Sequence, residues 1–402
     1  MTMKRNTLLL VLAGVVTSWF LAGCKEDPPP SLWDPGLVGG PQPQITSIDP
    51  PGEALAGVTV LTINGANFSP VKENNLVFFD DVLVPVLQAS ATQLQLKAPN
   101  EVGDTIKIKI AVKGADKFND PPATYRLIAA VVTAPGLGPS DEPWGTTVDG
   151  AGNVYVSIEL GGVTKVAPAP NDTGSSFAPA GGFAHWNCLR VGTDGKIYSS
   201  GNLAAIFEVR PNASPVPFVG PASGIGRVYT FDVDDQGNFW AGGNNPAMYR
   251  VTPGKNVKSF PFQGNVRSVR VYNGYLYIAG TIDSVQKVVR KPLISADSLG
   301  PTEEYFNLTS SPFGVTGKSI FVVEFTSGGD MFVGTDLADP LLIVHPNKIA
   351  EVFYPGVLTP AIHILAWSKG TTMYSVQANA AAGIINKGVK LLSVNTQTTG
   401  AP

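Results

Sequence analysis

The chain has 402 residues, of which 44 are Gly and 34 are Pro, while charged residues make up 15% and apolar residues 44%. Gly and Pro interrupt helices, so this composition excludes a helical bundle, and the apolar content excludes a disordered chain. The net charge of -3 gives no electrostatic support for nucleic-acid binding. The composition therefore predicts a turn-rich, all-β protein that is long enough for more than one domain.

Residues 1–23 have the pattern of a signal peptide. The basic pair Lys4 and Arg5 precedes an apolar run over residues 8–22 that is too short to span a bilayer as a stable helix. The run ends in the sequence LAGC, which resembles the bacterial lipobox. The resemblance implies that Cys24 carries the lipid and becomes the first mature residue. The alternative is an ordinary signal peptide followed by an incidental Cys.

The residues after Cys24 indicate to which membrane the protein is transported. Position 25 is not Asp, so retention in the inner membrane is not signalled, and the run KED resembles the surface-export signal of Bacteroidetes lipoproteins. The alternative is a merely solvated charge run. Residues 24–43 continue as a Pro- and Gly-rich segment, which predicts an extended tether. We therefore expect a lipid anchor in the outer membrane that faces the exterior, with the periplasmic face as the alternative.

Residues 44–127 predict a small β-sandwich. Short apolar runs alternate with turn signals there, and one run, residues 106–112, alternates Ile with Lys as a half-buried strand does. Four stretches resemble the IPT/TIG family: ITSIDP from Ile45, LTINGANF from Leu61, NLVF from Asn75 and SATQL from Ser90. The resemblance implies an Ig-like domain that serves as a spacer or binding module and carries no catalytic residues.

A repeat occupies residues 128–396, before a short tail at 397–402. Six segments share an apolar strand, a Gly-centred turn and a second strand. The turn glycines recur at intervals of 37 to 55 residues, at Gly152, Gly195, Gly237, Gly274, Gly329 and Gly370. This interval is typical of a four-stranded propeller blade. The repeat therefore predicts a six-bladed β-propeller, with three clear units and three degenerate ones.

The last unit lacks a fourth strand of its own. A spare apolar strand, AVVTAPG from Ala130, precedes the first unit and resembles VFYPG from Val352 in the fifth. We therefore predict that residues near 129–134 complete the last blade. This pairing would close the ring without an exposed sheet edge and would join the sandwich to the propeller with almost no linker.

The first unit, PWGTTVDGAGNVYVS from Pro143, resembles an NHL repeat. A lipobox, an IPT/TIG-like domain and an NHL-like propeller in this order resemble uncharacterised surface lipoproteins of Bacteroidetes, which are often associated with glycan use. That association belongs to the families rather than to these residues.

Propeller ligands bind at a mouth of the central channel, near the start of each innermost strand. The candidate ligand-binding residues at these places are Trp144, Trp186, Asn187, Tyr229, Arg267 and His363. Their aromatic rings would form a platform for a sugar ring, and their polar groups would bond its hydroxyls. The alternative is that the aromatic side chains pack between blades.

A metal or a His base would be the basis of an enzyme at the same mouth, as in propeller lactonases and lyases. The chain has three His, and the weak metal candidates are His185, His363, Glu142 and Glu324. The ordered Asn, Asp and Glu set of gluconolactonase-like enzymes is not evident. We therefore assign no catalytic residue, metal or cofactor.

Together these patterns predict a non-enzymatic outer-membrane lipoprotein that binds an extracellular ligand, a glycan above all, through its propeller. Two alternatives remain open. One is a channel-mouth enzyme of the lyase or lactonase type, and the other is a scaffold that binds outer-membrane proteins.

Overall fold

The computed structural model describes residues 39–169, 171–314, 317–378 and 388–401. The predicted signal peptide, the predicted lipidation site Cys24 and most of the predicted tether lie outside these residues. The described elements are strands β1 to β34 and two short 3-10 turns, η1 (Lys72–Asn74) and η2 (Pro221–Ser223). Within the described ranges, no helix is long and apolar enough to cross a membrane.

The N-terminal domain is a sandwich of two sheets. One sheet has the order β1 (Gln44–Asp49), β3 (Val60–Ala66), β7 (Gln93–Lys97), β6 (Val86–Ala89). The other has the order β2 (Glu53–Leu55), β9 (Ala123–Ile128), β8 (Gly103–Val112), β4 (Asn75–Phe79), β5 (Val82–Val84). Ile106, Ile108 and Ile110 of β8 are buried between the sheets, because alternate residues of a strand point to the same face.

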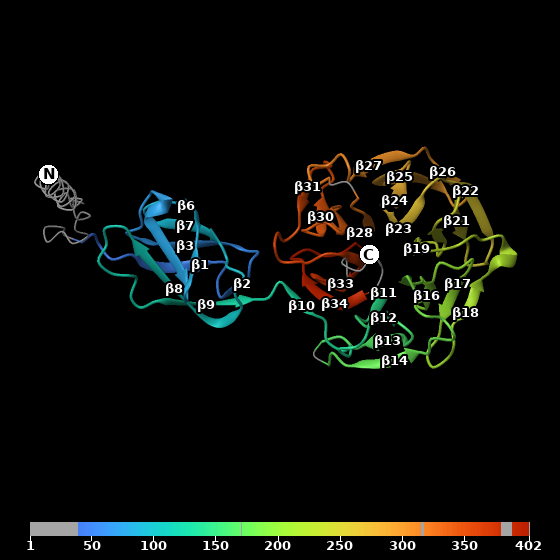
Figure 1. Cartoon of the computed structure of the whole chain (residues 1–402), viewed down its shortest axis with the longest axis horizontal. Helices are drawn as coiled ribbons and strands as arrows, with labels where there is room; N and C mark the ends of the chain where they lie inside the picture. Colours follow the sequence, from blue (N-terminus) through green and yellow to red (C-terminus); the bar gives the residue numbers. More distant parts are fainter. Residues whose placement is uncertain (1–38, 170, 315–316, 379–387, 402) are drawn as a thin grey trace, which may run out of the picture.

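Six sheets follow in a ring, as Figure 1 shows. Blade one contains β11 (Pro143–Val148), β12 (Val154–Ile158), β13 (Gly162–Val166) and β14 (Gly174–Ala178). Blade two contains β15 (Cys188–Val191), β16 (Ile197–Ser200), β17 (Ile206–Val209) and β18 (Val216–Val219). Blade three contains β19 (Thr230–Val233), β20 (Phe239–Gly242), β21 (Ala247–Val251) and β22 (Val257–Pro261).

Blade four contains β23 (Asn265–Tyr272), β24 (Tyr275–Ile282) and β25 (Val285–Ser295), with both β26 (Ser298–Leu299) and β27 (Glu303–Asn307) paired to β25. Blade five contains β28 (Ile320–Phe325), β29 (Met331–Thr335), β30 (Leu341–Val344) and β31 (Ala350–Val352). Blade six contains β32 (Ile362–Trp367), β33 (Thr372–Ala378), β34 (Gly388–Asn395) and β10 (Val131–Thr133). The predicted all-β fold of a sandwich and a six-bladed propeller is thus confirmed.

The first strands of the blades contact one another in sequence around the ring, and β32 contacts β11, so these strands line the central channel. The turn after each first strand contains one of the six repeating glycines, all with φ between 76° and 94°. Glycine adopts this left-handed conformation without steric penalty. In blade three the Asp234 carboxylate accepts bonds from the backbone N–H of Gln236 and Asn238, which fixes the tight turn.

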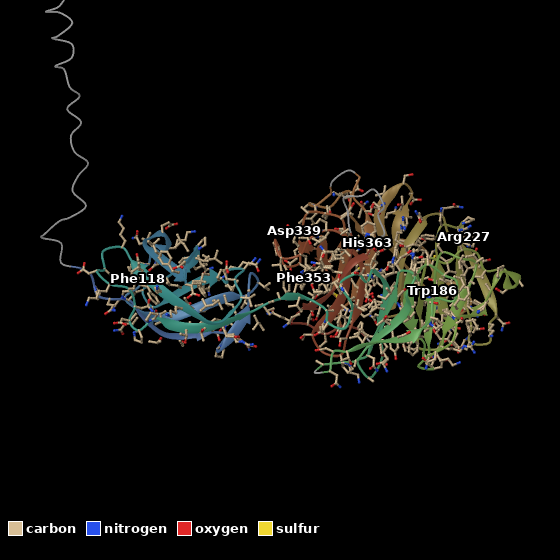
Figure 2. All side chains as sticks on the ribbon, turned by 60° about the horizontal axis from the view of Figure 1, so that its bottom comes forward. Phe118, Trp186, Arg227, Asp339, Phe353 and His363 are labelled. Atoms are coloured by element: carbon tan, nitrogen blue, oxygen red, sulfur yellow. The ribbon has the colours of Figure 1, made fainter. Side chains whose placement is uncertain are left out.

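The ring closes through a strand that precedes blade one in the sequence. β10 pairs antiparallel with β34, with Val132 opposite Ser393, where we expected residues near 129–134 to lie. The sandwich also packs directly on this region, because Leu55 belongs to the same buried cluster as Tyr354 and Leu358. Figure 2 shows Phe353, which packs against this cluster, on the side of the propeller next to the sandwich.

Candidate functional site

The central channel is nearly closed at its middle. Small side chains from the first strands, Thr146, Cys188, Thr230 and Ser268 among them, line a void of about 10 Å³. Such a void holds at most a single water molecule. Arg190 and Arg267 both line this void, which therefore lies between the two ends of the channel. We call the end at the start of the first strands the first mouth (Trp144, Asn187, Tyr229, Arg267, Phe321, His363) and the opposite end the second mouth (Arg190, Asp232, Arg270, Glu324).

A stacked pair joins blades one and two at the first mouth. The half-buried Trp144 ring lies on the His185 ring, with centroids 3.5 Å apart and planes 5° apart. His185 Nδ1 lies 2.7 Å from Glu159 Oε2, and this hydrogen bond orients the imidazole. Trp144 Nε1 is buried and has no hydrogen-bond partner among the described residues.

Two further pairs complete the first mouth. The Arg267 guanidinium lies over the Tyr229 ring, 5.0 Å from its centroid, and the His363 ring stacks on Phe321 with centroids 4.1 Å apart. Burial and, to a smaller extent, the positive charge of Arg267 together lower the pKa of His363 to about 4, so the imidazole is neutral at neutral pH. His363 Nε2 is also buried without a partner in the described part of the chain.

The structure corrects one of the predicted ligand-binding residues. Trp186 is only 1% exposed and packs with Phe183 and Phe207, so it belongs to the core between blades, the alternative stated for these aromatic residues. Figure 2 labels Trp186 and His363 at different places in the propeller. Asn187 is 8% exposed and lines the narrow void of the channel together with Arg267.

The weak metal candidates are not brought together. His185 bonds Glu159, His363 stacks on Phe321, and Glu324 lies at the second mouth. The backbone carbonyl of Glu142 accepts a bond from the Glu159 N–H. Across the described ranges, no three His, Cys, Asp or Glu residues gather closely enough to hold a metal ion.

The second mouth contains a group of charged residues that we did not predict from the sequence. A cavity of about 150 Å³ there is lined by Arg190, Asp232, Arg270 and Glu324, one from each of blades two to five. Asp232 Oδ1 lies 3.3 Å from Arg190 Nε and 3.5 Å from Arg270 Nη1. Arg270 in turn holds both oxygens of Glu324 through Nε and Nη2.

Burial dominates the titration of the second-mouth acids. It raises the pKa of Glu324 to about 8 and that of Asp232 to about 6, and the nearby Arg190 guanidinium opposes both shifts. The Asp232 carboxylate also accepts the backbone N–H of Val271 at 2.8 Å. With these arginine and backbone partners the acids serve first as links between strands.

One sequence signal could have found this set. Charged residues stand four or five places before the turn Gly in four consecutive repeats, at Arg190, Asp232, Arg270 and Glu324. Each is unremarkable alone, and only the alignment of the blades shows that they share one end of the channel.

Comparisons with known proteins agree with this architecture. Residues 43–125 match the IPT/TIG domain family, and no curated protein sequence matches the chain. A putative phosphatase from Bacteroides thetaiotaomicron superposes with a TM-score of 0.55 at 10% identity, covering 90% of this chain and 99% of that one. This likeness shows the fold alone.

Two other solved structures superpose less closely. An auxiliary nutrient binding protein from Bacteroides thetaiotaomicron has a TM-score of 0.49 at 11% identity and covers 90% of this chain and 98% of that one. A gluconolactonase from Xanthomonas campestris has a TM-score of 0.49 at 11% identity and covers 75% of this chain and 91% of that one.

Proposed function

We propose that the protein is a non-enzymatic lipoprotein of the outer-membrane surface whose propeller binds an extracellular glycan at the first mouth. The observation that carries this proposal is the set of three ring pairs there: Trp144 with His185, Tyr229 with Arg267, and Phe321 with His363. They combine flat apolar faces with N–H groups. Sugars present apolar ring faces and oxygen acceptors, which match both features.

Two buried nitrogens support a ligand at this place. Trp144 Nε1 and His363 Nε2 have no partner among the described residues, although buried polar groups are normally hydrogen-bonded. A sugar oxygen that enters the mouth, after a small shift of either ring, would supply the missing bond. In the second mouth, by contrast, the charged side chains largely bond one another.

Affinity electrophoresis against a panel of soluble polysaccharides tests the glycan function. We expect at least one glycan to retard the full chain in mild detergent, and Trp144→Ala to lose most of that retardation. Ile294→Ala is the matched control, because Ile294 is an apolar side chain that is 67% exposed and lies near the end of β25 in blade four. A correctly folded protein that no glycan retards would count against the function.

The anchor needs a test of its own. The LAGC sequence and the tether composition support lipidation of Cys24. We expect Cys24→Ser to move the protein from the membrane fraction to the soluble fraction of its cells. External protease added to intact cells should digest the wild-type protein; full protection from protease would place the protein on the periplasmic face instead.

A further inference from the structure

We propose that the first mouth selects an anionic glycan with carboxylate groups, a polyuronate, and that Arg267 determines this specificity. The inference rests on the glycan-binding function proposed above, because it assigns a ligand class to the same mouth. Three features of the described residues lead to it: the pairing of the arginines, the unpaired donor of Trp144, and the ion pairs of the second mouth.

Arg267 differs from the other arginines of the channel and blade interior. Arg190 and Arg270 both contact Asp232, and Arg250 contacts Asp297. No carboxylate of the described residues forms an ion pair with Arg267, whose guanidinium lies instead over the Tyr229 ring. A partly buried guanidinium without a counter-ion is unfavourable, so a ligand that brings a negative charge would gain the energy of pairing it.

One neighbouring group is a donor without a partner. An indole Nε1 only donates, and Trp144 Nε1 has no partner in the described part of the protein. The Asn187 amide lines the void beside Arg267, and the nearby Glu159 carboxylate already bonds His185. A ligand that satisfies Trp144 Nε1 must therefore offer an acceptor, and carboxylate oxygens are strong ones.

The second mouth provides an internal comparison. Its two arginines both have acidic partners, Asp232 and Glu324. Arg190 and Arg267 line the same narrow void of about 10 Å³, but no ion pair joins Arg267 to either acid among the described residues. The negative groups at one end of the channel therefore do not contact the positive group at the other.

A uronate ring fits the first mouth in both of its properties. Its apolar face suits the aromatic rings, and its carboxylate matches the fork of a guanidinium, which binds two oxygens at once. The guanidinium carbon of Arg267 lies 5.0 Å from the centroid of the Tyr229 ring. A neutral sugar would leave the Arg267 charge unpaired.

The decisive experiment compares one polysaccharide in two charge states. The full chain in mild detergent is run through gels that contain polygalacturonate or its fully methyl-esterified form, in which each carboxylate is masked as an ester. We expect at least tenfold tighter binding to the acid form. Raising the ionic strength from about 0.05 M to about 0.5 M should weaken that binding several-fold, because salt screens a partly exposed ion pair.

Variants then assign the effect to Arg267. Arg267→Ala should lose at least tenfold in affinity for polygalacturonate and change little toward the ester, while Arg267→Lys should keep part of the preference. Arg210→Ala removes the same charge from an exposed position after β17 and should change neither affinity. Arg267→Gln and the melting temperature of each variant separate a lost contact from a lost fold.

Each other outcome has a defined meaning. Equal binding of acid and ester by the wild type and by Arg267→Ala would overturn the anionic preference but leave glycan binding intact. Equal losses in Arg267→Ala and Arg210→Ala would overturn the role of Arg267 in favour of general charge attraction. Retardation by no charged or neutral glycan would remove the proposed function and this inference together.

Discussion

The Arg270 guanidinium donates hydrogen bonds to both oxygens of the Glu324 carboxyl group, and the same guanidinium contacts Asp232. These three residues lie on the first strands of blades four, five and three, respectively. One side chain thus links three neighbouring blades at the second mouth. Because Arg270 is only 5% exposed at its side chain, this link lies in a low-dielectric environment where its loss is felt strongly.

Arg270→Met should destabilise the propeller substantially. It leaves the buried Glu324 carboxyl group without its arginine partner and removes one of the two arginines that contact Asp232, a loss that typically costs about 3 kcal/mol or more. A loss of that size corresponds to a fall of roughly 6 °C or more in the melting temperature of a domain this large. Differential scanning calorimetry of the propeller transition measures it.

The matched control is Lys196→Met, which breaks an exposed pair with Glu208 in blade two. Exposed pairs contribute at most about 1 kcal/mol, so its melting temperature should barely change. An equally small effect of Arg270→Met would show that the buried link does not stabilise the ring.

Val132→Pro should weaken ring closure. The N–H of Ala134 bonds Leu391 O, and antiparallel ladders alternate, so the N–H of Val132 also belongs to the ladder with β34. Proline removes that donor and leaves a carbonyl of β34 without its partner, at a cost of about 1–3 kcal/mol. The Val132 side chain is 48% exposed, so little core packing is lost.

Thr133→Pro is the adjacent control, because the N–H of Thr133 points away from β34 and its side chain is exposed. Calorimetry should show a clear drop in the propeller transition for Val132→Pro and a small one for Thr133→Pro. The reverse order would contradict the pairing of β10 with β34.

Truncation of Trp186 should mainly reduce stability, whereas truncation of Trp144 should mainly reduce glycan binding. Trp186→Ala removes a ring that is 1% exposed and should destabilise the fold by about 3–5 kcal/mol. Trp144→Ala removes a half-buried ring at the mouth and should reduce glycan retardation while the melting temperature falls less. Binding that survives Trp144→Ala unchanged would place the ligand elsewhere.

The His363 imidazole should make stability depend on pH in acid. Its pKa is about 4 in the folded protein, lowered by burial and by Arg267, against an ordinary value of 6.5. Between these values only the unfolded chain takes up the proton, so stability is full above pH 6.5 and falls as the pH drops toward 4. Melting curves of His363→Gln should lack this part of the decline.

His345→Gln supplies a control of opposite sign. A hydrogen bond to Asp330 raises the pKa of His345, so its charged form stabilises the fold at acidic pH, and this stabilisation disappears as the pH rises through the folded value. The difference in melting temperature between the wild type and this variant should therefore shrink with rising pH. A constant difference would contradict the role of the charged imidazole.

The overall fold was predictable because it depends on a strong periodic requirement. Each blade needs a tight turn after its first strand, and the left-handed glycines, such as Gly237, mark that turn in every copy. The Ile alternation of residues 106–110 likewise reveals a strand with one buried face. Such patterns lie within a few residues of one another, so a single sequence displays them.

The side chains that face the channel were harder to predict. Neighbouring residues of a strand point to opposite faces, so a shift of one position exchanges a channel residue for a core residue. Register irregularities occur near the start of four first strands, between Pro143 and Thr146, Val266 and Ser268, Ile320 and Val322, and Ile362 and Ile364. The local residue types do not indicate such a bulge. From the sequence, Trp186 and Trp144 were therefore equally good candidates for side chains at the channel mouth.

The pairing of β10 with β34 also has a mechanical consequence. If the chain is held by its N-terminal end at a membrane, a drag force on the propeller passes through the sandwich and reaches the ring first at β10. That strand lies at the outer edge of blade six, where a pull along its axis loads several backbone hydrogen bonds at once. The apolar contact of Leu55 with the same blade region shares this load. The strand that closes the ring, β10, is thus also the strand through which such a force would enter the propeller.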